Sequence, residues 1–511
     1  MKLTKNYLEE RTRVFEVEGT RYPSVALVQM ELLPGYERAQ KRLLAYIRSV
    51  NEAHLVMLSE QNIITSADAA IIMRALETID YASYTQKTYS GKFEDLYFEI
   101  EDEIIRQTNG VGGNLHLARS RNDMCVAWSH MAIRDDILSL MNRVIHFQNT
   151  VLLFAEEHKN TIYAIHTHTQ HAQPGLLGHY FLGVVDVLDR GVTRLQAAYD
   201  ATNCSPMGAA AVTTSGFPVS RERVAELTGF DRVIENSYDA IGNCEYFTGT
   251  ASAMGLLALD LGRVVTDLLL WATEEEKMIR LADGYISTSS IMPQKRNPIA
   301  LEHLRSSLSM VKGLSDAVMI GFLKSPYGDI SDYEDIEDTM SGTFDLLNKN
   351  LDLFNAVMAT MDVNKQILEE RVHESFSVVT EIADQMVRSY AIPFRQAHHF
   401  VARMVKKADR LHYGLRQISP AFFEETFEEV FGRKFEGDFA PILQSMDPHY
   451  FVQTREVLGG TGSQAMENMI ASGRQKVANN QAWLVRHQEA LAVSDKKRME
   501  QVEFICKGTA D

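Results

Sequence analysis

The sequence predicts an all-α protein built around a bundle of long helices, and three observations support this prediction. Proline in a helix interior costs about 3 kcal/mol. No proline lies between Pro34 and Pro174, or between Pro218 and Pro293, so long helices are permitted there. Alternating patterns typical of strands are scarce. Apolar residues recur at spacings of three and four, as one helix face requires, at Met254, Leu257, Leu261, Val264, Val265 and Leu268.

The predicted elements divide the 511 residues into three parts. Residues 1–115 contain shorter helices and turns, and a glycine cluster at 110–113 ends this part. Residues 116–365 form the bundle, in which helices of about 30 residues would each extend about 45 Å. Residues 366–511, where prolines return, form a smaller helical domain with glycine-containing loops.

Composition excludes several classes of protein. A formal charge of −17, from 51 basic and 68 acidic residues, argues against a nucleic-acid-binding protein. The longest apolar runs fall short of the roughly 20 residues that span a bilayer, so we expect no transmembrane segment. Residues 1–13 lack the apolar core of a secretory signal. The four cysteines form no CxxC pair, which argues against zinc, an iron–sulfur cluster or a disulfide scaffold, and we expect a cytoplasmic protein.

Residues 114–123, NLHLARSRND, place two arginines among Ser120, Asn122 and Asp123. Guanidinium forks and amide groups are donors that suit a carboxylate, so this segment is a candidate anion-binding site. A solvated turn that caps a helix through Ser120 or Asn122 is the alternative interpretation.

Residues 166–174, HTHTQHAQP, bring His166, His168 and His171 close together. Their spacing fits neither HExxH nor a zinc finger, and no local Cys, Asp or Glu completes a ligand set, so we expect no metal. A histidine that transfers a proton or donates a hydrogen bond is the functional interpretation, because its unperturbed pKa lies near working pH. A histidine satisfied in the core is the alternative.

Residues 287–305, STSSIMPQKRNPIALEHLR, combine a polar loop with the start of a helix. The preceding Asp-Gly pair at 283–284 and the Ser and Thr residues predict a mobile loop, and apolar spacing after Pro298 predicts a helix. The Lys-Arg-Asn sequence at 295–297 stands at the helix entrance, where backbone N–H groups and the helix dipole favour an anion. The segment therefore predicts an anion pocket beneath a flexible loop. An exposed basic loop, the alternative, does not explain the serine pair.

Residues 289–298, SSIMPQKRNP, resemble the signature loop of the fumarase/aspartase superfamily, whose members eliminate fumarate from succinyl compounds. Further segments resemble the argininosuccinate lyase branch in the same order, and the similarity covers nearly the whole chain; they are residues 116–123, 167–174, 217–243, 393–398 and 458–462. The resemblance implies a three-domain all-α fold whose central helices assemble into a tetrameric core. It also implies active sites that are each shared by three subunits. We expect no cofactor.

The same resemblance implies the catalytic roles. Elimination needs a base for the proton beside a carboxylate, stabilisation of the carbanion and a proton for the departing nitrogen. Ser289 matches the family's base, and Lys295 with the loop backbone would lower its pKa. His168 matches the family histidine and Glu302 its carboxylate partner. Whether His168 protonates the leaving nitrogen or only orients the substrate stays open.

Substrate binding is implied for a second set of residues. Lys295 and Asn297 would hold the carboxylate whose negative charge grows in the transition state. The other matches are to residues that bind the succinyl carboxylates or add hydroxyl and backbone contacts to the substrate: Ser120, Arg121, Asn122, Thr167, Ser290, Met292 and Tyr327.

The chain departs from the argininosuccinate lyase pattern mainly where that family binds the leaving group. Tyr97 replaces a histidine, and Ile47 and Asn51 stand where an aspartate and a serine are expected. After Tyr327, residues 328–335 (GDISDYED) contain neither the glutamine nor the lysine that hold the amino-acid end of the arginine moiety. Lost polar contacts leave binding groups unpaired, so we expect argininosuccinate to be a poor substrate.

We therefore expect a carbon–nitrogen lyase that eliminates fumarate from another N-substituted aspartate, such as ethylenediamine-disuccinate, by anti-elimination. Its partners would be this small molecule, fumarate and copies of itself, with neither nucleic acid nor membrane. Argininosuccinate lyase, which forms arginine and fumarate, is the alternative. A non-catalytic, crystallin-like protein is a second alternative, but the intact Ser289, Lys295, Asn297 and His168 argue against it.

Overall fold

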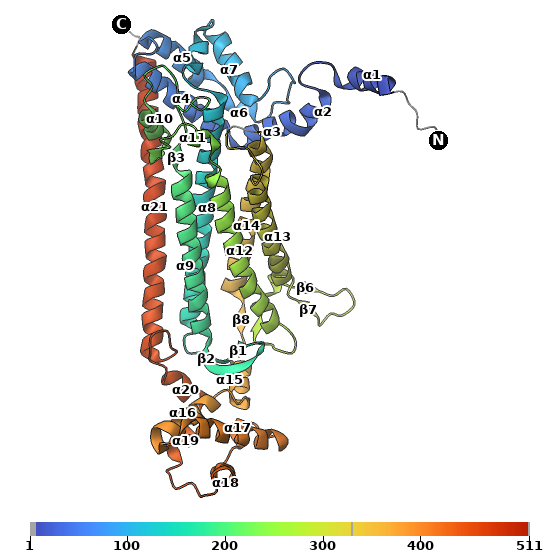
Figure 1. Cartoon of the computed structure of the whole chain (residues 1–511), viewed down its shortest axis with the longest axis vertical. Helices are drawn as coiled ribbons and strands as arrows, with labels where there is room; N and C mark the ends of the chain where they lie inside the picture. Colours follow the sequence, from blue (N-terminus) through green and yellow to red (C-terminus); the bar gives the residue numbers. More distant parts are fainter. Residues whose placement is uncertain (1–6, 329–330, 509–511) are drawn as a thin grey trace.

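The computed structural model describes residues 7–328 and 331–508, and most of these residues lie in helices (Figure 1). The middle of the molecule is a bundle of long helices, as the proline-free stretches predict. At 1.5 Å per residue, the 37 residues of the longest of them, α8 (Arg121–Glu157), extend about 55 Å. The bundle consists of α8 (Arg121–Glu157), α9 (Leu177–Thr202), α12 (Glu245–Trp271), α13 (Ile299–Gly321) and α14 (Asp332–Thr360). The all-α prediction is confirmed.

Short helices lie at the upper end of the bundle in Figure 1, and the first of them extends away from the bundle to the side. They are α1 (Tyr7–Glu18), α2 (Val25–Leu27), the π-helical turn η1 (Val28–Leu32), α3 (Leu33–Arg42), α4 (Leu44–Glu60), α5 (Ser66–Thr78), α6 (Tyr81–Tyr84), α7 (Leu96–Gln107), the 3-10 turn η2 (Val111–His116), α10 (Arg221–Thr228) and α11 (Asp239–Gly242). The first long helix begins at Arg121 and not near residue 116, because η2 and a helix cap at Ser120 precede it.

A second group of helices lies at the lower end of the bundle. It contains α15 (Lys365–Glu374), α16 (Val379–Tyr390), α17 (Phe394–Arg410), the 3-10 turn η4 (Leu415–Gln417), α18 (Pro420–Phe431), α19 (Ala440–Ser445) and α20 (Pro448–Gln453). From there α21 (Ser463–Lys507) runs back along the whole bundle to the upper helices (Figure 1). The division of the chain near residues 115 and 365 stays a prediction.

The strands of the described residues form short two-stranded sheets. β1 (Ile162–Thr167) pairs antiparallel with β2 (Gln170–Leu176), and β6 (Ser287–Thr288) pairs antiparallel with β7 (Arg296–Asn297). Two further pairs are β3 (Cys204–Ser205) with β4 (Arg232–Val233), which are parallel, and β5 (Ile279–Arg280) with β8 (Asp362–Val363), which are antiparallel. The short 3-10 turn η3 (Asp283–Tyr285) precedes β6.

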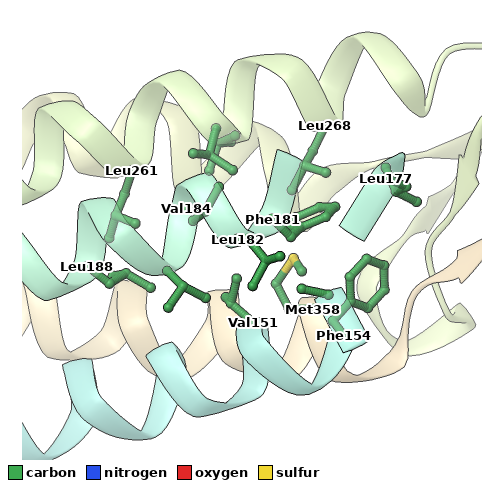
Figure 2. Packing of buried hydrophobic residues seen from close by; sticks show 14 of the residues in the cluster. Val151, Phe154, Leu177, Phe181, Leu182, Val184, Leu188, Leu261, Leu268 and Met358 are labelled. Carbon is green, nitrogen blue, oxygen red and sulfur yellow. The ribbon is translucent and has the colours of Figure 1, made fainter. Parts of the chain in front are cut away.

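The core of the bundle is apolar and closely packed. Figure 2 shows side chains from four helices meeting between them: Val151 and Phe154 of α8, Leu177, Phe181, Leu182, Val184 and Leu188 of α9, Leu261 and Leu268 of α12, and Met358 of α14. Phe181 meets Phe154 edge to face with ring centroids 4.7 Å apart. Burial of this kind supplies most of the stability of long amphipathic helices, and it holds their ends in fixed positions.

The sequence predicts no transmembrane segment and no disulfide scaffold. Across residues 7–328 and 331–508, none of the helices combines the length and the apolar content that crossing a bilayer requires. All four cysteines have free thiols.

Candidate active site

The polar segment at the start of α8 is fixed by a capping box. Ser120 is the N-cap: its Oγ accepts the backbone N–H of Asn122 at 3.3 Å, and the Asp123 carboxylate accepts the backbone N–H of Ser120 at 2.9 Å. Asn122 Nδ2 donates to the carbonyl of Ala211 at 3.4 Å. Ser120 therefore caps α8, as the capping interpretation expects, and the cap holds Ser120 and Asn122 at the upper end of the bundle; the role of this segment in binding an anion stays a prediction.

Asp123 joins this cap to a neighbouring loop. Its carboxylate is fully buried and also accepts the backbone N–H groups of Gly208 at 2.9 Å and Ala210 at 3.0 Å. Asp123→Ala would leave these donors unpaired, so we expect the free energy of unfolding to fall by about 3 to 5 kcal/mol. Asp123→Asn keeps one acceptor oxygen and should lose less. Urea denaturation measures both, and equal losses in the two variants would contradict this account of Asp123.

Arg121 follows the cap and is already paired. Its Nη1 lies 2.8 Å from Glu94 Oε1 and its Nη2 lies 3.0 Å from Asp95 Oδ2. Burial opposes the charge, but Asp95 and Glu94 outweigh burial and raise the pKa of Arg121. The ring of Phe98 lies 5.2 Å from the guanidinium carbon. Arg121 is thus a fixed cation whose charge two carboxylates largely balance, and its role in binding substrate stays a prediction.

Asn51 and Tyr97, which differ from the argininosuccinate lyase pattern, both accept hydrogen bonds from one buried arginine, Arg119. Arg119 Nη1 donates to Asn51 Oδ1 at 2.8 Å, and Arg119 Nη2 donates to the Tyr97 hydroxyl at 3.0 Å. The Tyr97 hydroxyl in turn donates to Glu101 Oε1 at 2.8 Å. The substituted residues therefore form one hydrogen-bonded network, which connects α4, α7 and the segment just before α8.

The histidine segment forms a hairpin that the sequence did not predict. Thr167 ends β1, and His168 and Thr169 make the turn into β2 with φ of 53° and 58°. Two successive left-handed residues are typical of the tightest hairpin turns, which favour Asn and Gly. Histidine and threonine are strained there, and such strain persists where function selects it. The turn exposes Thr167 and His168 at the lower end of the bundle.

The other two histidines of this segment lie behind the turn. His166 and His171 meet edge to face, 4.9 Å apart, and burial lowers the pKa of both. Neither belongs to a group of possible metal ligands. In the described parts of the chain one such group occurs, elsewhere, where Glu369 Oε1 accepts hydrogen bonds from His373 at 2.9 Å and from His449 at 2.7 Å.

The serine segment forms a projecting arm, here called the β6–β7 arm (residues 287–297). Strand pairing of Ser287 with Asn297 and of Thr288 with Arg296 closes its base, and Figure 1 shows the arm extending sideways from the bundle. The predicted loop is therefore a hairpin with a fixed base. Arg296 anchors it, because its Nη1 lies 2.6 Å from Asp283 Oδ1 and its Nη2 donates to the Leu281 carbonyl at 2.9 Å.

The tip of the arm arranges donors around Ser289. Its Oγ accepts the backbone N–H groups of Ile291 at 3.4 Å and Met292 at 3.2 Å. Two N–H donors that converge on one oxygen favour its ionised form, and Lys295, which belongs to the same arm, would add to this effect if its ammonium group approached the oxygen. Ser290 and Lys295 are exposed at this tip, while Asn297 Nδ2 donates to Ser287 Oγ at 3.3 Å in the base.

The remaining predicted site residues lie at the two ends of α13. Glu302 is exposed in its first turn, next to the arm. Tyr327 lies beyond its last turn, where its hydroxyl donates to Asp239 Oδ1 at 2.5 Å and its ring stacks on Tyr238 with centroids 5.6 Å apart. The hydrogen bond to Asp239 raises the pKa of Tyr327 to about 12, so this phenol is neutral at physiological pH.

One chain thus holds the predicted site residues in three separate groups. Ser120 to Asn122 and Tyr327 lie at the upper end; Thr167 and His168 occupy the β1–β2 turn; residues 289–297 and Glu302 belong to the arm and the start of α13. The length of α8, about 55 Å, separates the first group from the second. Over the described ranges, no hydrogen bond or ion pair joins different groups, His168 and Glu302 included.

A cavity of about 300 Å³ opens beside Arg121 and Asn122 at the upper end. Its wall includes Trp128 of α8 and Glu334 and Glu337 of α14, none of which belongs to a motif that the sequence predicts to be functional. The sequence signal that could have indicated the two glutamates is their spacing of three residues, which places both on one face of a helix. Sequence alone did not indicate which surface this face meets.

Comparison with known proteins places the chain in a family. Residues 26–313 match a family model described as Lyase, and residues 376–452 match one described as Argininosuccinate lyase C-terminal. The chain belongs to the argininosuccinate lyase branch of the fumarase/aspartase superfamily. Argininosuccinate lyase 2 of Agrobacterium fabrum is 33% identical over 463 residues, which are 90% of this chain and 92% of that protein. Argininosuccinate lyase of Methanococcoides burtonii is 32% identical over 432 residues, 84% of this chain and 87% of that protein.

Solved structures agree with this assignment. EDDS lyase in complex with formate superposes with a TM-score of 0.84 at 27% identity, covering 92% of this chain and 93% of that chain. The fumarate lyase of Mesorhizobium sp. BNC1 shares the fold, with a TM-score of 0.68 over 86% of this chain and 96% of its own, at 15% identity. The predicted family and fold are confirmed, and this lyase of the argininosuccinate lyase branch is a fumarate-releasing carbon–nitrogen lyase.

Proposed function

We propose that this lyase eliminates fumarate from an N-substituted aspartate by anti-elimination, with Ser289 as the base. The Ser289 oxygen takes a proton from the carbon beside one carboxylate, and the electron pair of that C–H bond moves into this carboxylate. This electron pair then forms the C=C bond of fumarate as the C–N bond breaks. The nitrogen leaves with its bonding pair and takes up a proton, so an amine and fumarate are the products.

The observation that carries this proposal is the environment of Ser289 Oγ. A serine hydroxyl is a weak base unless its alkoxide is stabilised. Here the backbone N–H groups of Ile291 and Met292 point at the oxygen, and Lys295 adds a positive charge on the same tip. Lys295 and Asn297 also suit the second task, which is to stabilise the carboxylate that gains charge. Ser290 and Met292 would contact the substrate beside the base.

The other two groups of residues would come from other copies of the chain. No single chain can join positions at opposite ends of a helix of about 55 Å. We therefore propose a homotetramer in which antiparallel bundles bring Ser120 and Asn122 of one copy, Thr167 and His168 of a second and the β6–β7 arm of a third to one site. His168 would meet Glu302 there, and Arg121 and Tyr327 would complete the upper-end group.

For the substrate, the similarity to EDDS lyase supports an N-substituted aspartate such as ethylenediamine-disuccinate. The segment after Tyr327 also supports a change of substrate, because residues 328–335 contain no glutamine or lysine. Asp329 and Ile330 of this segment lie outside the described residues. Argininosuccinate is the second candidate, favoured by the names of the relatives that share about a third of their residues with this chain.

Fumarate formation from a panel of substrates tests this choice. Absorbance of fumarate is followed with argininosuccinate, ethylenediamine-disuccinate and simple N-alkyl aspartates at equal concentrations. We expect kcat/KM for argininosuccinate to be at least about 100-fold below that of the best N-substituted aspartate, because contacts to its amino-acid end are lost. A highest kcat/KM with argininosuccinate would establish the second candidate instead. Absence of fumarate from every compound would contradict the proposed substrate class.

A further inference from the structure

Two histidines and one glutamate converge at the lower end of the bundle, outside the three groups of predicted site residues. Glu369 and His373 belong to α15, and His449 belongs to α20 (Figure 1). Glu369 Oε1 accepts hydrogen bonds from both imidazoles, and the possible ligand atoms of the three side chains all lie within 4.8 Å of one another. Because Glu369 and His449 are 80 positions apart in sequence, only folding brings the group together.

Local structure places each of the three side chains. Glu369 and His373 are four residues apart and therefore lie on one face of α15, at the spacing that pairs of zinc ligands on a helix use. His449 stands at the start of α20, where the Asp447 carboxylate caps the helix and accepts the backbone N–H of His449 at 3.0 Å. Two separate helices thus hold the three side chains against one another.

The carboxylate of this group has no lysine or arginine partner among the described residues. Its ion pairs involve only His373 and His449. Arg371, which follows Glu369 on the same helix, pairs with Glu276 instead. A carboxylate and two imidazoles together offer three ligand atoms and a single negative charge, which suits a divalent cation.

The spacing of these ligand atoms is close to that around a bound ion. Zinc lies about 2.0 to 2.2 Å from an imidazole nitrogen or a carboxylate oxygen, and tetrahedral angles then place neighbouring ligand atoms about 3.4 Å apart. Here Glu369 Oε1 lies 2.9 Å from His373 Nε2 and 2.7 Å from His449 Nε2. Loss of the two Nε2 protons and an outward shift of about half an ångström would make room for the ion.

Exposure of the group allows this shift. The side chains of His449 and Glu369 are 46% and 40% exposed, so they can move without disturbing the core. The open side also leaves room for a water molecule as the fourth ligand, which is the usual arrangement where a protein supplies only three.

We propose that Glu369, His373 and His449 bind one divalent transition-metal ion, and that Zn²⁺ is the ion they suit best. Imidazole ligands favour zinc and its neighbours, whereas magnesium and calcium prefer sets of oxygen ligands. The ion would join α15 to α20. Since α15 packs against β1 and α20 packs against β2, it would clamp together the two helices beneath the β1–β2 hairpin. This inference does not depend on the proposed substrate or on the proposed base.

Zinc binding to the assembled enzyme tests the proposal. The protein is freed of any affinity tag, stripped with a chelator and titrated calorimetrically with Zn²⁺. No substrate is present, because aminopolycarboxylates themselves chelate metals. We expect one tight site per chain, and His373→Ala and His449→Ala should each weaken it at least about 100-fold, since each removes one of three ligands. Mg²⁺ and Ca²⁺ should not displace the zinc.

His399→Ala is the matched control. His399 is an exposed histidine on α17, in the same lower group of helices, and it does not belong to the group of possible ligands. Its zinc affinity should stay within about two-fold of wild type. Circular dichroism confirms that each variant keeps its helical content.

Amide hydrogen exchange locates the bound ion. Zn²⁺ should slow exchange several-fold in α15 and α20 of the wild-type enzyme, and it should leave exchange in these helices of His449→Ala unchanged. A merely structural contact between the helices would not respond to zinc.

Each contrary outcome is decisive. A wild-type enzyme with no tight zinc site, or folded His373→Ala and His449→Ala variants that both bind zinc as wild type does, would overturn the proposal. Slower exchange confined to helices other than α15 and α20 would also overturn it. Neither experiment measures fumarate, so these outcomes leave the proposed function untouched.

Discussion

Replacing Ser289 with alanine should lower kcat by about 1000-fold while KM and inhibitor binding stay within about two-fold of wild type. The reason is local. The Ser289 oxygen is the atom on which the N–H groups of Ile291 and Met292 converge, and alanine removes that atom without disturbing the strand pairing at the base of the arm. Steady-state fumarate release and the inhibition constant of succinate measure the two quantities.

Thr288→Ala is the control for this experiment. Thr288 is the neighbouring residue, it is exposed on β6, and its strand pairing with Arg296 uses backbone groups that alanine retains. Its activity should stay close to wild type. A Ser289→Ala enzyme with more than about a tenth of the wild-type kcat would show that another group removes the proton.

The helical bundle could be predicted because its signals are local. Proline-free stretches and apolar spacings of three and four define long helices without reference to the rest of the chain. The β1–β2 hairpin was missed because its turn uses His168 and Thr169 in left-handed conformations, where a sequence pattern would show Asn or Gly. The β6–β7 pairing was missed because strands of two residues are too short to show an alternating pattern in the sequence.

The candidate site was predicted in its parts and not in its arrangement. Ser120 and Ser289 stood out through motifs whose residues are neighbours in sequence. The acidic cavity was not predicted, because Glu31, Glu94 and Glu334 are far apart in sequence and meet only through packing. The pairing of Arg121 with Glu94 and Asp95 was missed for the same reason.

The separation of the site residues within one chain has a direct consequence for mixed assemblies. If every active site takes Asn122 from one copy and Ser289 from another, then two inactive variants can complement each other. Asn122→Ala and Ser289→Ala, each inactive alone, would form mixed tetramers with some sites that contain neither alanine. With equal amounts and random assembly, about one quarter of the sites would be intact.

A pair of changes on the same arm provides the control. Ser289 and Lys295 both belong to the β6–β7 arm, so any site receives both residues from the same copy. Mixed tetramers of Ser289→Ala and Lys295→Ala would therefore contain no intact site. These two mixtures differ only in whether the altered residues lie in one group or in two.

The most direct measurement is the fumarate-forming rate of these two mixed populations, prepared by co-expression with two different tags and purified through both. We expect the Asn122→Ala and Ser289→Ala mixture to recover about one quarter of the wild-type rate, and the Ser289→Ala and Lys295→Ala mixture to stay inactive. Purified mixed assemblies that recover no activity in the first case, or equal activity in both, would contradict an active site built from several copies of this chain.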